Sequence, residues 1–122
     1  MISVLLVDDE PQVLETTARF LRRCGMHVTC APSPFGVSAL VLREAPDVVV
    51  LDFNMPGLDG AHLLPLLRAS NRTAATRVIF HSGEPEAFLS TLALTSGASY
   101  SCKARGARAL ADAIVLAMNG PP

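Results

Sequence analysis

The chain has 122 residues, of which 50% are hydrophobic and 17% are charged. These proportions are typical of one globular domain with a buried core, and they exclude an intrinsically disordered chain. The formal net charge is −1, so no excess of positive charge favours direct binding to nucleic acid.

The first residues and the cysteines indicate the compartment. Residues 1–7 lack the basic flank and cleavage site of a signal peptide, and no apolar run approaches the ~20 residues that cross a bilayer. Cys24, Cys30 and Cys102 are odd in number and contain no Cys-x-x-Cys, which is typical of free thiols. We expect a soluble, cytoplasmic protein without membrane contacts.

Short apolar runs alternate with longer segments of helical periodicity along the chain. The expected strands are Ser3–Val7, Met26–Ala31, Val48–Leu51, Arg77–His81 and Ser99–Cys102. The expected helices are Pro11 to Cys24, Pro34 to Ala45, Ala61–Ala69, Pro85–Thr95 and Ala107–Met118. Five strand–helix units in one short chain predict a single α/β domain over residues 1–122 with a doubly wound parallel sheet.

Local signals support several of these boundaries. Pro11 suits a first helical turn, and Ser33 is expected to cap the second helix with Pro34 at its first position. Pro46 is expected to end that helix, because proline disfavours helical backbone before it. Pro65 lies inside the third expected helix and contradicts the pattern there.

Polar side chains follow the strands at the point where each strand ends. Asp8 and Asp9 follow the first strand, Asp52 the third, Ser82 the fourth and Lys103 the fifth. Function collects at this edge in open parallel sheets, so we expect these side chains to converge. Lys103 is the only lysine among ten basic residues, which argues against a role in solubility alone.

These residues together resemble the receiver domain of bacterial response regulators. The resemblance covers the whole chain and rests on the acidic pair after the first strand, on residues 51–60 (LDFNMPGLDG), on Ser82, and on Gly97-Ala98 leading to Tyr100 and Lys103. It implies a flavodoxin-like or CheY-like fold with helices on both faces of the sheet and strand order 2-1-3-4-5.

Three converging carboxylates repel one another unless a cation neutralises them, and Mg²⁺ prefers a few carboxylates plus water. The resemblance implies Mg²⁺ as cofactor, bound directly by Asp9, Asp52 and the main-chain carbonyl of Asn54, with Asp8 contributing through water. It also implies that Asp52 accepts a phosphoryl group. Capping of the first helix is the alternative for Asp8, Asp9 and Glu10, but it leaves Asp52 and Lys103 unexplained.

The resemblance gives the other residues roles in switching and hydrolysis. Lys103 and Ser82 are expected to bind phosphoryl oxygens, and Tyr100 to turn inward when the Ser82 hydroxyl moves. Asn54 and Glu84 are expected to flank the path of hydrolytic water. Tyr100 also fits an ordinary half-buried strand aromatic, and Asn54 and Glu84 fit plain loop polarity.

Two positions depart from the family pattern. Ala104 stands where a proline in a cis peptide usually follows the lysine, and we expect a trans bond because a cis bond without proline costs ~3 kcal/mol. His81 stands where an apolar strand residue is common. We expect a strand-end histidine with satisfied hydrogen bonds rather than a ligand.

The sequence thus predicts a phosphoacceptor switch, not an enzyme acting on a metabolite, with a histidine kinase or phosphotransfer protein as partner. The expected helices Pro85–Thr95 and Ala107–Met118 are apolar around most of their circumference, so with the fifth strand they are expected to dock a second copy or an attached output domain. The tail Asn119–Pro122 fits a chain end and a linker equally well.

Two alternatives remain open. One is a receiver-like docking module that no longer depends on phosphorylation, which the intact Asp9, Asp52, Ser82 and Lys103 argue against. The other is a haloacid-dehalogenase-like aspartyl-phosphate phosphohydrolase, whose family pattern requires a second aspartate where Asn54 stands.

Overall fold

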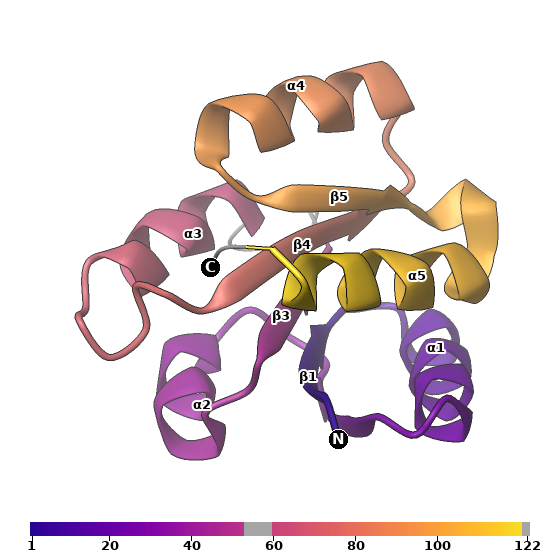
Figure 1. Ribbon diagram of the computed structural model, residues 1–122, viewed down its shortest axis with the longest axis horizontal. Helices are drawn as coiled ribbons and strands as arrows, with labels where there is room; N and C mark the ends of the chain where they lie inside the picture. Colours follow the sequence, from indigo (N-terminus) through magenta and orange to yellow (C-terminus); the bar gives the residue numbers. More distant parts are fainter. Residues whose placement is uncertain (53–59, 121–122) are drawn as a thin grey trace.

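The computed structural model describes residues 1–52 and 60–120, without the side chains of residues 60–63. The strands are β1 (Ser3–Val7), β2 (His27–Ala31), β3 (Val48–Leu51), β4 (Arg77–Ser82) and β5 (Ser99–Cys102). The α-helices are α1 (Pro11–Arg23), α2 (Val37–Glu44), α3 (Gly60–Arg68), α4 (Glu86–Ser96) and α5 (Gly106–Met118), and Lys103–Arg105 forms a short 3₁₀ helix, η1. Figure 1 shows how these elements alternate along the chain.

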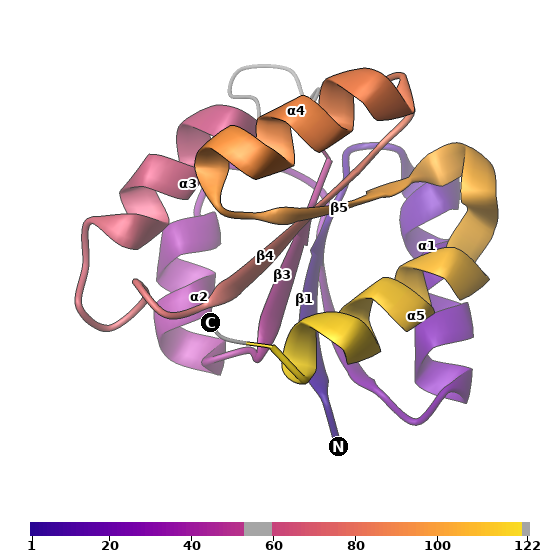
Figure 2. The same ribbon diagram turned by 45° about the horizontal axis from the view of Figure 1, so that its top comes forward.

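The sheet is parallel throughout, with the order β2-β1-β3-β4-β5. Helices α1 and α5 lie on one face, and α2 and α3 lie on the other, with α4 beside β5 (Figure 2). The predicted fold class and strand order are confirmed. Each crossover helix covers apolar strand residues that a parallel sheet cannot leave in water.

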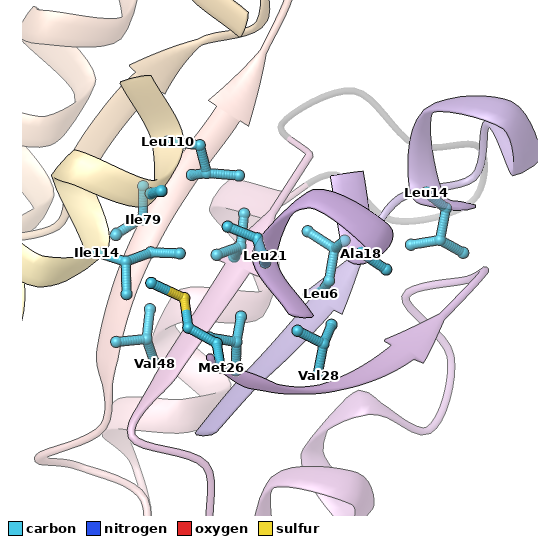
Figure 3. Packing of buried hydrophobic residues seen from close by; sticks show 13 residues of the cluster. Leu6, Leu14, Ala18, Leu21, Met26, Val28, Val48, Ile79, Leu110 and Ile114 are labelled. Atoms are coloured by element: carbon cyan, nitrogen blue, oxygen red, sulfur yellow. The ribbon is translucent and has the colours of Figure 1, made fainter. Parts of the chain in front are cut away.

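The face under α1 and α5 carries one of the two hydrophobic cores (Figure 3). Leu14, Ala18 and Leu21 lie at helical spacing on α1 and pack with Leu110 and Ile114 of α5. Alternate strand residues complete this core on the side of the sheet: Val4, Leu6, Val28, Val48, Val50 and Ile79. The period-two alternation of the strands assigns these residues to this face.

The opposite face carries the second core, under α2 and α3. Its strand residues are the intervening ones: Leu5, Val7, Ala31, Val49, Leu51, Val78 and Phe80. Leu92 of α4 and Tyr100 of β5 pack against it and are only partly buried. The unbroken apolar runs of β1 and β3 are therefore explained by burial on both faces.

Two predictions about the start of α2 are wrong, namely the cap at Ser33 and the first helical position at Pro34. Ser33 does not cap α2, because its Oγ accepts a hydrogen bond from the N–H of Phe35 at 3.1 Å and so forms a turn. The helix instead begins at Val37, after Gly36 in left-handed backbone with φ 78°. Glycine adopts this conformation without a steric penalty, so it reverses the chain before α2.

The remaining boundaries agree with the prediction to within a residue or two. Pro65 lies inside α3, as the sequence indicated, and the helix continues beyond it. Pro46 follows Ala45, which takes left-handed backbone with φ 46° and ends α2. Among the described residues, no helix has the length and apolar character to span a membrane.

Candidate functional site

Four of the predicted site residues lie at or just beyond the carboxyl ends of strands: Asp8, Asp52, Ser82 and Lys103. Asp8 follows β1 and Asp52 follows β3, and the N–H of Asp52 donates to the carbonyl of Val7 at 3.0 Å. Ser82 ends β4 opposite Cys102 of β5, so Lys103 comes one residue beyond that pair. Asp8, Asp52 and Ser82 are all buried. Strand register therefore brings these side chains to one rim.

The ammonium of Lys103 lies among three carboxylates. Its Nζ is 2.9 Å from Oδ2 of Asp8, 3.1 Å from Oε1 of Glu10 and 3.2 Å from Oδ2 of Asp52. The Asp8 and Asp52 side chains are 3% and 5% exposed, so water screens these pairs far less than surface pairs. The ammonium places a positive charge directly beside two buried carboxylates.

Two opposing effects act on the pKa of Lys103. Burial lowers this pKa, but the hydrogen bond that Lys103 donates to Asp8 and the charges of Asp52 and Asp8 outweigh burial and leave the pKa above its usual value. Lys103 is therefore cationic throughout the physiological pH range.

The same three carboxylates fit a hard divalent cation. In the described part of the chain, Asp8, Glu10 and Asp52 each offer an oxygen, and these atoms lie within 4.8 Å of one another. Opposite ligands around Mg²⁺ stand roughly 4.2 Å apart, at twice the ~2.1 Å ligand distance, so small side-chain movements would bring these oxygens around one ion. Oxygen-only donors and incomplete protein coordination are what Mg²⁺ prefers.

Glu10 is a member of this group that the sequence did not single out. It stands at the N-terminal boundary of α1 in extended backbone with φ −90° and ψ 107°, and its N–H donates to Oδ1 of Asp8 at 3.0 Å. This backbone lets the Glu10 carboxylate reach Lys103 although the side chain is 60% exposed. Asp9 is half-buried and is not in the described group, so its role as a metal ligand stays a prediction.

Ser82 and Glu84 form a turn after β4. The Ser82 Oγ accepts a hydrogen bond from the N–H of Glu84 at 3.3 Å. This weak bond places the hydroxyl at the start of the loop that leads to α4. The roles of Ser82 in phosphate binding and of Glu84 in hydrolysis stay predictions, and Asn54 lies outside the described residues.

Tyr100 lies opposite Phe80 in the β4–β5 register and packs against the core under α2 and α3. Its side chain is half-buried, as expected for an aromatic on an edge strand. This position connects the β5 edge to the buried Phe80. It is compatible with the predicted inward turn, which no observation on the described residues tests.

The prediction for His81 is wrong in one respect. Its Nε2 is buried without a hydrogen-bond partner among the described residues. Burial, followed by the positive charge of Lys103, lowers the pKa of His81 to about 4, against an opposing effect of Asp8. The imidazole is therefore neutral near pH 7. It follows Phe80 on the strand, so its side chain lies on the α1 and α5 face, where it lines a cavity together with Thr17 and Lys103.

The segment after Lys103 differs from the family pattern as expected. None of the described peptide bonds is cis, so Lys103–Ala104 is trans. Residues Lys103–Arg105 form η1 instead, and Gly106 then turns the chain into α5 with φ 84°. The guanidinium of Arg105 reaches back to Glu86 of α4 at 2.7 Å. This ion pair links the two loops that carry Ser82 and Lys103.

Comparisons with known proteins agree with this geometry. The profile of the response regulator receiver domain matches residues 4–114. The positive alginate biosynthesis regulatory protein of Pseudomonas aeruginosa is 35% identical over 116 residues, which are 93% of this chain and 46% of that protein. The probable transcriptional regulatory protein TcrX of Mycobacterium tuberculosis is 40% identical over 70 residues, 57% of this chain and 30% of that protein. The chain thus spans less than half the length of these relatives.

Solved structures give the same result over nearly the whole chain. The receiver domain of Francisella response regulator 1452 has a TM-score of 0.86 and 27% identity, with 98% of each chain covered. A response regulator receiver domain from Clostridium thermocellum has a TM-score of 0.86 and 29% identity, with 98% of this chain and 95% of that one covered. With its strand order, its rim of acids and its lysine, the chain belongs to the receiver domain family of response regulators.

Proposed function

We propose that residues 1–122 act as a receiver domain that accepts a phosphoryl group on Asp52 from a histidine kinase or phosphotransfer protein. One observation carries this proposal. The buried Asp52 carboxylate lies 3.2 Å from the Lys103 ammonium, at the carboxyl edge of the sheet and beside a second buried acid, Asp8. A nucleophilic carboxylate and a cation for phosphoryl oxygens are thereby next to each other.

The chemistry needs little beyond these groups. An oxygen of Asp52 attacks phosphorus, a new P–O bond forms, and the bond from phosphorus to the donor imidazole breaks. The donor nitrogen leaves with the electron pair and takes up a proton. Lys103 then binds an oxygen of the transferred group, so its ammonium exchanges part of its contact with Asp52 for a contact with the phosphoryl group.

Mg²⁺ bound among Asp8, Glu10 and Asp52, with Asp9 and the Asn54 carbonyl as further expected ligands, would neutralise the charge that develops on the phosphoryl oxygens. The chain contributes the ligands and holds them. Asp8 and Asp52 are fixed by strand ends, and the N–H of Glu10 further orients Asp8. Burial of both aspartates limits access of water to the acyl phosphate.

Switching follows from the Ser82 hydroxyl. We expect it to donate to a phosphoryl oxygen and to draw the loop before α4 toward the rim. Tyr100 then turns into the space beside Phe80. Glu84 and Asn54 are expected to set the lifetime of the phosphorylated state. The domain catalyses its own phosphorylation and hydrolysis and acts on no other substrate.

The output surface in this proposal is α4, β5 and α5. Large apolar side chains are exposed on both helices, with Leu94 of α4 at 86% and Leu116 of α5 at 74%. Exposed apolar patches on this scale usually mark contacts between proteins. The relatives named above are regulatory proteins about twice as long, so we expect this face to contact a second copy or an attached output domain.

Labelling by acetyl phosphate in Mg²⁺ tests the proposal. Asp52→Asn should abolish labelling and leave the fold intact, because the change keeps the shape and removes the nucleophile. Asp112→Asn is the matched control, since Asp112 is exposed on α5 and should leave labelling unchanged. Stoichiometric labelling of Asp52→Asn would overturn the assignment, and an unlabelled wild type that still binds its partner would favour the phosphorylation-independent docking module.

A further inference from the structure

A cavity lies at the other end of the sheet, away from Asp52. Its volume is about 260 Å³, and it opens between the first residues of β4 and β5 and the last turn of α5. Its polar wall is formed by Arg68, Arg77 and Ser99, and its apolar wall by Tyr100, Leu116 and Ala117. The cavity therefore offers charge on one side and hydrocarbon on the other.

Both arginines are held in place by main-chain carbonyls. The Arg68 Nη1 donates to the carbonyl of Thr76 at 2.7 Å. The Arg77 Nε donates to the carbonyl of Ala117 at 2.9 Å, and its Nη2 to that of Gly120 at 3.4 Å. These bonds fix the two guanidinium groups, yet each leaves most of its five N–H groups unused.

Neither charge is neutralised by a carboxylate of the described residues. In residues 1–52 and 60–120, no carboxylate lies within ion-pair distance of Arg68 or Arg77. Burial lowers the pKa of Arg68, as expected for a cation that loses water without gaining an anion. Two fixed, uncompensated guanidinium groups in one cavity are the arrangement that binds a phosphate or carboxylate through paired N–H groups.

We propose that this cavity binds a small organic anion, with its phosphate or carboxylate on Arg68 and Arg77 and its apolar part against Tyr100 and Leu116. The cavity lies at the amino ends of the strands and shares no residue with the carboxylate group of Asp8, Glu10 and Asp52, although Tyr100 lines it and also belongs to the proposed switch. An inorganic ion alone would leave the apolar wall uncovered, so an anion that carries a ring or short chain fits better than free phosphate.

Phenyl phosphate is the probe, titrated into the ¹⁵N-labelled wild-type chain without Mg²⁺, so that the acidic rim repels anions. We expect saturable shifts of the amides of Arg77, Ser99, Tyr100 and Leu116. Benzoate distinguishes carboxylate from phosphate preference. Phenol has the ring without the charge and should bind at least about tenfold more weakly.

Arg68→Gln and Arg77→Gln should each weaken phenyl phosphate binding by at least about tenfold, and the exposed Arg108→Gln should not. The amide shifts of the wild-type chain test the proposal without any substitution. The proposal therefore stays testable even if Arg77→Gln does not fold. Absence of saturable shifts at the cavity, equal binding of phenol, or unchanged binding in both arginine variants would overturn the proposal. None of these outcomes depends on labelling of Asp52.

Discussion

The Lys103 ammonium is closer to Asp8, at 2.9 Å, than to Asp52, at 3.2 Å. Lys103 is therefore held from the β1 end of the rim while it contacts the proposed phosphoacceptor on β3. Because Lys103 contacts both aspartates, it offsets their charge before phosphorylation. It can then bind a phosphoryl group on Asp52 while it keeps its contact with Asp8.

Lys103→Arg should not restore switching, although the charge is kept. A planar guanidinium cannot replace a compact ammonium that contacts three carboxylates at once. We expect slow phosphorylation and a blunted response to beryllofluoride, measured by amide shifts in α4 and β5. A wild-type response in this variant would contradict the role given to Lys103.

Lys103→Gln should lower the free energy of unfolding by about 3 kcal/mol without Mg²⁺, because buried Asp8 and Asp52 lose their cation. The loss should be smaller in Mg²⁺, which would neutralise the same carboxylates. Urea unfolding with and without Mg²⁺ measures both values. Arg108→Gln is the control, and its exposed side chain should contribute under about 0.5 kcal/mol. Equal losses in the two buffers would argue against a shared cation position.

His81→Val should remove part of the acid sensitivity of folding. The pKa of His81 is lowered to about 4 in the folded chain, from an ordinary 6.5, so between these values the unfolded chain binds the additional proton. His81 therefore costs stability as pH falls through this window, by up to about 3 kcal/mol at its lower end. Urea unfolding of both proteins at several pH values isolates the effect, because all other titrating groups are shared. A constant difference in stability from pH 7 to pH 4 would contradict it.

Leu94→Asp or Leu116→Asp should weaken self-association of the beryllofluoride-bound domain by at least about tenfold. Both side chains are exposed on the proposed α4–β5–α5 contact face. Leu66→Asp is the matched control, because Leu66 is an exposed leucine on α3. Light scattering or analytical ultracentrifugation, with and without Mg²⁺ and beryllofluoride, measures the change. A strict monomer in both states would end the expectation of a homodimer.

The sequence predicted the sheet because its signals are strong and local. The β-branched run of β3 and the helical spacing on α1 each have one economical interpretation, and the polar strand ends then converge by topology. The sequence alone therefore places Asp8, Asp52, Ser82 and Lys103 on one rim.

Other features depend on backbone angles or on distant packing. Glu10 joins the carboxylate group only because its backbone is extended before α1. Ser33 had the residue type of a cap, but its hydroxyl bonds Phe35 instead. The missing partner of His81 Nε2 depends on which side chains of other elements surround it, and no local pattern encodes that.

The two cores of the interior support different parts of the proposed output surface. Leu92 and Tyr100, on the proposed signalling face, pack against the core under α2 and α3, whereas Leu14, Leu21 and Ile114 belong to the other core. The close-packed sheet stands between them, so a volume change at Ile114 is felt first by α1 and α5. A substitution in either core therefore alters support of the proposed output surface, through α4 and β5 from the core under α2 and α3, and through α5 from the other core.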